Sequence, residues 1–346
     1  MNEEIKENKM GVMPMNRLII NMSVPMMISM LVQALYNVVD SIFVAMIDEK
    51  ALTAVSMAFP IQGLIIAVAA GTGVGVNAIL SRALGAKNNE KADKTAENGI
   101  FLAVASYVVF LLIGIFAVKP FYMSQTDDME IVNYGVKYLT IVCVLSLGVF
   151  IQIMFERLLQ STGKTVYTMI SQALGAVINI IMDPIMIFGI GFFPKMGVTG
   201  AAAATVIGQI AAAAVGFMFN KTKNKEIHIN MIGFRPDTGM IKEIYEIGVP
   251  SMVMQAIGSV MVYGMNRILI TFNSTGVAVF GVYFKLQSFV FMPVFGLNNG
   301  MIPILAYNLG AHKRERFMQG VKLSVIYAVI IMTAGTVLFE LLPGPM

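Results

Sequence analysis

Residues 24–44 read VPMMISMLVQALYNVVDSIFV, and this stretch indicates the kind of fold. It overlaps a run, 18–39, that contains no Asp, Glu, Lys or Arg. Four more such runs follow, at 51–81, 98–118, 138–155 and 196–220. A helix needs about 20 apolar residues to cross the hydrocarbon layer of a membrane. Lipid offers no partners to free backbone groups, so spanning segments must be helices or closed barrels. Barrel strands are only about 10 residues long and alternate in polarity, which these runs do not. The sequence therefore predicts an all-α membrane protein.

The composition of the whole chain agrees with a lipid environment. Of its 346 residues 57% are hydrophobic and 13% are charged, and the mean hydropathy is +0.76, whereas a soluble domain carries about 25% charged residues. The lone cysteine, Cys143, excludes an intramolecular disulfide, and His228 and His312 lie in loop-like stretches. We therefore expect no Cys/His metal site and no cofactor. No Ser/His pair lies within the apolar runs, which argues against an enzyme. The net charge of +4 follows from the distribution of basic residues and does not indicate a nucleic-acid partner.

Nine membrane-spanning helices are predicted from the apolar runs and the charges between them. Their approximate ranges are 17–47, 52–82, 95–118, 131–156, 165–193, 197–220, 241–272, 276–308 and 318–342. When the spans alternate in direction, eighteen Lys and Arg residues fall in the loops on one side. The other side receives four: Lys50, Lys119, Lys137 and Lys195. Basic residues collect on the cytoplasmic side of membrane proteins. We therefore expect a multi-pass protein of the inner (plasma) membrane with a cytoplasmic N-terminus.

An internal repeat divides the chain. The stretch VPSMVMQAIGSVMVYGMNRILI from Val249 resembles residues 24–44, and GMIPILAYNLGAHK from Gly300 resembles GVNAILSRALGAKN from Gly75. Four matched pairs lie 225 positions apart: Pro25 and Pro250, Gln62 and Gln287, Gly75 and Gly300, Gly85 and Gly310. A unit of six spans gives both copies the same orientation, so they should be related by an axis along the membrane normal. Transporters built from such parallel repeats place the substrate site between the halves.

The repeat predicts two lobes and a connection between them. Residues 1–220 are expected to form a lobe of six transmembrane helices. Residues 221–240, charged and then reading IGFRPDTG, are expected to form a cytoplasmic linker. Residues 241–346 would form a partial second lobe of three helices. Because the second unit has three spans where the first has six, the chain looks truncated, and we expect the intact protein to carry three more helices.

Ionisable side chains inside a membrane are costly, which makes each of them a functional candidate. Asp40 and Asp183 lie at similar distances along two outward-running spans, so their carboxyl groups should share one depth in the outer half of the membrane. Asn179 precedes Asp183 by four residues on the same helix face, and Tyr36 and Asn37 precede Asp40 by four and three. Desolvation favours the protonated form of a carboxyl group, and a nearby cation opposes this. We interpret the pair as a site for a proton or a cation, the alternative being that each Asp is bonded to a neighbouring helix.

Other residues within the spans are weaker candidates. Glu156 is expected at the end of the fourth span, where it either attracts a cationic substrate or is an interfacial charge paired with Arg157. Arg267 and Lys285 are interpreted as structural, the first as the partner of a carboxylate outside this chain and the second as snorkelling to the outer surface. Pro25 lacks a backbone donor and is expected to act as a hinge in the first span.

Several motifs together point to one family. They are the Val-Pro start of each half, YNVVDSIFV around Asp40, SRALGAKN at the end of the second span, NIIMDPIMIFG in the fifth and GAAAATVIGQ in the sixth. In these features the chain resembles the multidrug and toxic compound extrusion (MATE) transporters, most closely their MepA-like bacterial branch, and the resemblance covers essentially the whole chain.

The resemblance implies a monomeric antiporter of two six-helix lobes among membrane lipids. It would export bulky, often cationic, drugs in exchange for protons or sodium ions. The family's cation site carries over to Asp40, Asn179, Asp183 and Thr205, the first three as candidate sodium ligands. Substrate-binding candidates are Glu156, which looks like a drug-interacting acid of the closer branch, and Tyr36, Asn37, Gln62 and Gln287. Some members place a coupling Glu in the seventh helix, where this chain has Asn266 and Arg267, and this favours a cation site in the first lobe.

A flippase for lipid-linked precursors, which shares the distant architecture, is the alternative function. It should have a wider and more cationic cavity for phosphate groups. Within the spans only Arg267 and Lys285 could supply that charge.

Overall fold

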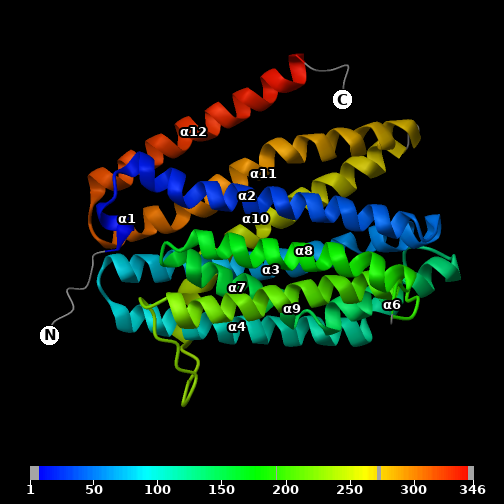
Figure 1. The fold of residues 1–346 in the computed structure, drawn as a ribbon, viewed down its shortest axis with the longest axis horizontal. Coiled ribbons are helices and arrows are strands. Elements are labelled where there is room, and N and C mark those ends of the chain that lie inside the picture. The colour runs from blue at the N-terminus through cyan, green and yellow to red at the C-terminus, as the bar shows by residue number, and fades with distance from the viewer. Residues whose placement is uncertain (1–7, 192, 271–273, 342–346) are drawn as a thin grey trace.

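Helices joined by loops make up the residues that the structure describes, and no strand occurs among them (Figure 1). The computed structural model covers residues 8–191, 193–270 and 274–341, with many side chains between 259 and 288 outside that description. The helices follow in this order: α1 (Lys9–Val12), α2 (Met15–Ala45), α3 (Glu49–Gly85), α4 (Asn89–Phe116), α5 (Val118–Met123), α6 (Met129–Val144), α7 (Leu147–Ser161), α8 (Thr165–Phe188), α9 (Val198–Lys223), α10 (Thr238–Ile270), α11 (Ser274–Gly310) and α12 (Arg314–Leu341).

Most of these helices are long and apolar enough to cross a membrane. Among the described residues seven helices qualify individually, and α6 with α7 can be counted as an eighth span. α11 qualifies over Phe289–Gly310. The predicted span 241–272 is helical up to Ile270 as α10, which is not among the seven. The prediction of an all-α, multi-pass membrane protein is confirmed.

The fourth predicted span, 131–156, consists of two helices. α6 and α7 meet at a bend of 44°. The hydroxyl of Ser146 donates to the carbonyl oxygen of Cys143 at 2.7 Å, and side chains that bond to the backbone ladder bend helices. Gly148 follows, where an added Cβ would already lie 3.1 Å from α9, so α7 packs closely against that helix. α7 also continues to Ser161, past the predicted end of the span.

Two groups of helices lie side by side (Figure 1). Helices α2 to α9 form one bundle, and α10, α11 and α12 lie along one side of it, where α10 packs on α3 and α11 packs on α2 and α3. We call these groups the first and second lobe. At the end of the molecule near the N-terminus the lobes touch, and toward the other end α10 and α11 diverge from α2 in Figure 1. Gly258 and Gly264, in the outer half of α10, accordingly have no packing atom within 4 Å of an added Cβ.

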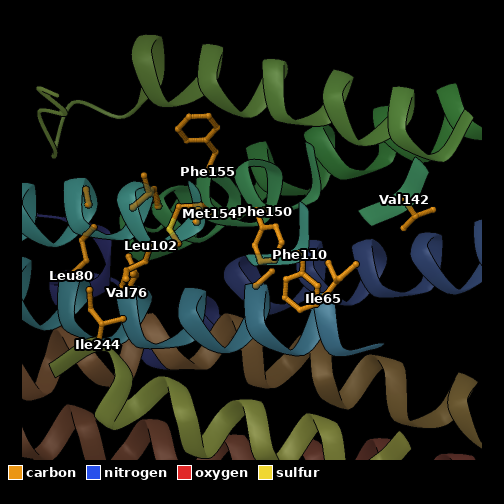
Figure 2. Packing of buried hydrophobic residues seen from close by; sticks show 14 of the residues in the cluster. Ile65, Val76, Leu80, Leu102, Phe110, Val142, Phe150, Met154, Phe155 and Ile244 are labelled. Carbon is orange, nitrogen blue, oxygen red and sulfur yellow. The ribbon is translucent and has the colours of Figure 1, made fainter. Parts of the chain in front are cut away.

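The core of the first lobe is apolar and tightly packed (Figure 2). Figure 2 shows Val76 and Leu102 of α3 and α4 against Met154 of α7, with Phe110 and Phe150 in contact farther along. Burial of such side chains contributes roughly 1.5–3 kcal/mol each in water. In lipid, close van der Waals packing of this kind holds helices together instead. This rigid bundle is the scaffold on which the polar side chains of the lobe are placed.

The contacts between the lobes follow the internal repeat. Gly85 of α3 leaves no room for a Cβ beside the carbonyl oxygen of Tyr307, and Gly310 of α11 leaves none beside the carbonyl oxygen of Arg82. Adding the 225-residue offset to the residues of one lobe in each contact gives the residues of the other lobe in the other contact, because 85 corresponds to 310 and 82 to 307. A second pair obeys the same rule: Gly71 with Met252, and Gly296 with Met27. The predicted parallel repeat is therefore built as a pseudo-twofold contact between the first two long helices of each lobe.

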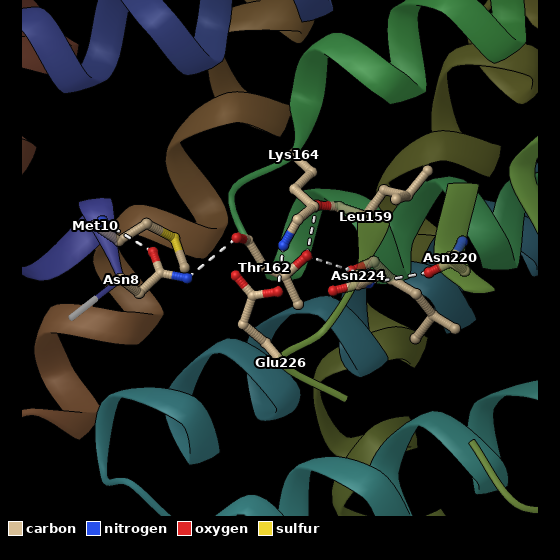
Figure 3. A network of polar contacts seen from close by, with 9 residues as sticks. Asn8, Met10, Leu159, Thr162, Lys164, Asn220, Asn224 and Glu226 are labelled. Atoms are coloured by element: carbon tan, nitrogen blue, oxygen red, sulfur yellow. Dashed lines mark hydrogen bonds and ion pairs between the residues drawn. The ribbon is translucent and has the colours of Figure 1, made fainter. Parts of the chain in front are cut away.

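The connection between α9 and α10 is held against the first lobe by polar contacts. Figure 3 shows its start, where Glu226 forms an ion pair with Lys164. Beside it, Asn8 donates to the carbonyl oxygen of Thr162 at 3.1 Å and ties the segment before α1 to the same place. Farther along, side chains of α4 accept three backbone N–H groups of the connection, at 2.7, 3.0 and 3.0 Å: Asp93 from His228, Glu97 from Asn230, and Asn98 from Asp237. The N-terminus, this connection and most of the basic residues therefore share one end of the molecule, which we call the basic end.

Candidate functional site

α2 and α8 bring Asp40 and Asp183 together inside the first lobe. The two helices pack side by side, and the two carboxyl groups are near enough to interact directly. They lie at one level, as their positions along the spans predict. Asp183 is fully buried, yet its Oδ2 and Oδ1 of Asp40 have no hydrogen-bond donor. Buried polar atoms are nearly always paired, so this pair has unused bonding capacity.

Asn179 and Thr205 complete this group because α8 and α9 approach closely. Gly175 and Gly208 face each other, and an added Cβ on either would lie within 3.0 Å of the other's carbonyl oxygen. One turn away, Nδ2 of Asn179 donates to Oγ1 of Thr205 at 3.4 Å and to Oδ1 of Asp183 at 3.5 Å. Both bonds are long for N–H···O, and Oδ1 of Asn179 has no donor. The four predicted coupling residues therefore lie in one cluster.

A cavity of about 70 Å³ opens in the first lobe beside Asn179 and Thr205. Its other polar lining residues are Gln33, Tyr36, Gln152, Glu156, Gln172 and Gln209. One water molecule needs about 10–15 Å³, whereas pockets for drug-sized ligands measure about 300–1,000 Å³. In this conformation the cavity has room for water or a small cation and no room for a bulky compound.

Four glutamines of this lining were not singled out by the sequence reasoning, namely Gln33, Gln152, Gln172 and Gln209. Nε2 of Gln152 donates to Oε1 of Glu156 at 2.9 Å, and Nε2 of Gln172 donates to Oε1 of Gln33 at 3.4 Å. A signal was available, because Gln152 precedes Glu156 by four residues and so shares its helix face.

Glu156 is buried inside the first lobe and bonds to Gln152, whereas the second interpretation expects a local pair with Arg157. It lies within α7 with 6% of its surface exposed, because α7 runs on to Ser161 and residues 157–161 are buried as well. Its carboxylate accepts from Gln152 and faces the cavity. The neighbouring Arg157 turns to α11 instead, where it donates to Asn299.

The remaining candidates lie outside the cavity lining. Asn37 is exposed on α2, and Gln287 is partly exposed on α11. Nε2 of Gln62 donates to the hydroxyl of Tyr138 at 3.1 Å, which links α3 to α6. Pro25 is buried within α2, which continues through it as one helix. These four residues are therefore not assembled with the acid pair in this conformation.

The cluster offers oxygen ligands only. Free oxygens of Asp40, Asp183 and Asn179 suit a hard cation such as sodium, since carboxylate and carbonyl oxygens are the ligands such ions prefer. A proton on one carboxyl group would equally supply the missing donor. Within the described residues no three His, Cys, Asp or Glu side chains are grouped as a metal site. The side chains of Arg267 and Lys285 lie outside the described residues.

The end of the molecule remote from the N-terminus carries an exposed ion pair. Lys50 at the start of α3 contacts Asp128 at 2.9 Å and Glu130 at 2.8 Å, at the start of α6. The hydrogen bond from Lys50 holds the pKa of Asp128 below its usual value. Because all three side chains are more than a third exposed, water screens this interaction.

Known proteins share both the sequence pattern and the fold. The family model MatE matches residues 25–185 and 250–346. The multidrug export protein MepA of Staphylococcus haemolyticus (strain JCSC1435) is 30% identical over 336 residues, which are 92% of this chain and 72% of that protein. MepA of Staphylococcus aureus (strain NCTC 8325 / PS 47) is 26% identical over 325 residues, 94% of this chain and 70% of that protein.

Two solved structures are similar over nearly the whole chain. One is described as the outward-facing conformation of a multidrug resistance MATE family transporter of the MOP superfamily. It has a TM-score of 0.91 and 27% identity, and the match covers 98% of this chain and 75% of that one. A MOP superfamily transporter from Pyrococcus furiosus has a TM-score of 0.88 and 26% identity, over 99% of this chain and 75% of that one.

Proposed function

This chain belongs to the MatE family and is a multidrug efflux transporter, and we propose that it is an antiporter exchanging protons or sodium ions for organic, often cationic, compounds. Relatives named as multidrug export proteins support the class of substrate. The described residues that line the cavity include Glu156 and neither Lys nor Arg. That lining favours cations over the phosphate groups that a lipid-precursor flippase would bind.

The unfilled acid pair carries the proposal of coupling. Asp183 is buried and Asp40 is half-buried, each with a buried oxygen that lacks a donor, and two carboxylates cannot both stay charged in such a place without a partner. A proton or a sodium ion satisfies them, and Asn179 and Thr205 adjust the bonding around whichever is bound. Loading of this site is the event that an ion gradient would drive.

Alternating access would convert that loading into export. The basic end faces the cytoplasm in this proposal, since basic residues collect there. Ion binding at Asp40 would bend α2 near Pro25, whose missing N–H weakens the helix at that point. Movement of α2 would then change the path between the lobes, where Asn37, Gln62 and Gln287 contact the drug. Tyr36 and Glu156 would attract it from the side of the first lobe.

Drug efflux tests this function. In cells or proteoliposomes loaded with ethidium, Asp40→Asn and Asp183→Asn should each slow efflux at least tenfold, because an amide cannot take up and release a proton. Asp127→Asn is the matched control, since Asp127 is an exposed loop carboxylate, and it should leave efflux unchanged. Imposed pH and sodium gradients across proteoliposomes identify the coupling ion. Undiminished efflux in both site variants would overturn the coupling role of the pair.

A further inference from the structure

Arg157 is a buried cation that joins the two lobes. Its side chain is 8% exposed. Nη1 donates to Oε1 of Gln160 at 2.9 Å within α7, and to Oδ1 of Asn299 at 2.9 Å on α11. Gly73 of α3 leaves space for its stem, since an added Cβ there would lie 2.6 Å from Cγ of Arg157. One of its two bonds is thus internal to the first lobe, and the other crosses to the second.

The first lobe holds Arg157 firmly at its backbone. The hydroxyl of Ser161 donates to the carbonyl oxygen of Arg157 at 2.6 Å. The hydroxyl of Ser81 in turn donates to the carbonyl oxygen of Ser161 at 3.0 Å. Oδ1 of Asn77 lies within hydrogen-bonding distance of both hydroxyls. All three side chains are fully buried, so α3 and α7 move as one body and carry Arg157 with them.

Asn299 reaches Arg157 only because α11 lies directly on the first lobe. At the next residue, Gly300, an added Cβ would lie 2.6 Å from Oγ of Ser23 on α2, and at Gly296 it would lie 2.5 Å from the backbone of Met27. Helices packed this closely can separate only when each moves as a rigid unit. Any opening between α11 and α2 therefore breaks the bond between Arg157 and Asn299, while the bond to Gln160 stays within its lobe.

We propose that Arg157 and Asn299 form a latch that holds the two lobes together at the basic end and breaks each time that end opens. The proposal rests on the alternating access proposed above. Arg157 acts here as a positioning residue and does not touch the drug. A buried guanidinium needs acceptors, and after separation water replaces Asn299, so the latch can open and close reversibly. The 225-residue offset puts Val74 at the position of Asn299 in the first repeat, so the latch is an asymmetric addition to a symmetric contact.

Cysteine labelling between the lobes measures the latch without any transport. Cys143 is the lone cysteine, and Cys143→Ala provides the background. Ser23→Cys places a thiol where α11 covers α2, at a side chain 2% exposed. Ser171→Cys is the control reporter, because Ser171 is fully buried between α8 and α9 within the first lobe. The readout is the rate of alkylation by a small water-soluble maleimide in detergent or nanodiscs without drug.

Two substitutions of Asn299 should act in opposite directions. Asn299→Ala removes the acceptor and should speed labelling of the Ser23→Cys thiol about tenfold, the usual range for a hydrogen bond to a charged group. Asn299→Asp turns the bond into an ion pair of the same shape and should slow that labelling by a similar factor. Arg157→Lys should behave like Asn299→Ala, since the lysine side chain is one bond shorter and its ammonium does not reach the position of Nη1. Labelling of the Ser171→Cys thiol should not change in any of these variants.

The outcomes separate the latch from the proposed function. Labelling that stays within about twofold in both Asn299 variants, or that moves in one direction in both, overturns the latch. A parallel rise at the Ser171→Cys thiol also overturns it, because the substitutions would then have loosened the whole lobe. If the Ser23→Cys thiol responds as expected while ethidium efflux is absent from the parent protein, the latch stands and the proposed antiport fails.

Discussion

Two buried polar clusters of the first lobe differ in how fully they are bonded. Around Arg157 the side chains are joined into a network, with hydroxyls and amide oxygens within 2.6–3.3 Å of their partners. Around Asp183 the bonds measure 3.4–3.5 Å, and three oxygens have no donor. Nδ2 of Asn77 lacks a partner in this network, but its other bonds are short, and a well-bonded network stabilises one arrangement of helices. An underbonded one costs stability and is maintained where a ligand completes it. The same lobe thus contains a rigid joint and a site prepared for an ion.

The largest expected effect on stability comes from the bonded cluster. Arg157→Met should lower the free energy of unfolding by roughly 3 kcal/mol, because the buried oxygen of Gln160 and the half-buried oxygen of Asn299 both lose their donor. Thermal unfolding in detergent, followed by a dye or by static light scattering, measures this. An unchanged midpoint of thermal unfolding would mean that the network around Arg157 is no more stabilising than the acid pair. The two clusters would then not differ in their contribution to stability.

The glycine contacts beside this cluster come next. Gly85→Ala should destabilise the protein by about 2 kcal/mol, because a methyl group overlaps the carbonyl oxygen of Tyr307 and the lobes must shift. Gly258→Ala is the matched control in α10, where an added Cβ meets nothing within 4 Å. It should stabilise slightly, since alanine favours helix by about 1 kcal/mol over glycine. Equal melting shifts in the two variants would contradict the tight contact between the lobes.

Substitution at the acid pair should change the free energy of unfolding in the opposite direction to substitution of Arg157. Asp183→Asn should keep or raise the free energy of unfolding, by up to about 1 kcal/mol, because it removes a buried charge whose Oδ2 has no donor and whose Oδ1 has one long bond. Efflux should nevertheless fall, as set out above. The measurement is the melting point of the variant beside that of Arg157→Met under one buffer. A loss of stability as large as that of Arg157→Met would show that Asp183 is a structural group.

The smallest effect is expected at the exposed ion pair. Lys50→Ala should lower the melting point at neutral pH only slightly, because exposed pairs are screened. The lowered pKa of Asp128 adds stability above the usual carboxyl range, and this contribution is lost as the pH falls through the lowered value. Melting points measured from pH 7 down to about pH 3 should therefore converge for the parent and Lys50→Ala. Divergence toward low pH would contradict this sign.

Helix positions and the repeat could be predicted from the sequence with good agreement. Charge-free runs mark most spans because a charge is costly in lipid. The bend at Ser146 could not be placed this way, since an apolar run looks alike whether its helix is straight or broken. The charge-free run likewise places Glu156 at the end of the fourth span, whereas α7 continues to Ser161. The burial of 157–161 by other helices is what extends the span.

The candidate site was predictable in its charged members and not in its neutral ones. Asp40 and Asp183 stand out in apolar helices, and equal depth along parallel helices implies proximity. Gln33 and Gln172 come from different helices, and their approach depends on how α2 and α8 are rotated about their axes. The amino-acid composition of the two helices does not indicate this rotation.

The sequence by itself therefore determined the membrane fold, the order of the helices, the parallel repeat and the acid pair, because each follows from the cost of charge in lipid or from a fixed spacing along the chain. Only the tertiary structure decided that Glu156 faces the cavity while its neighbour Arg157 joins the lobes, and that the matched glycines are the points where the lobes touch. Adjacent residues on a helix point about 100° apart, so the packing around α7, and not the chain order, assigns each of them its partner.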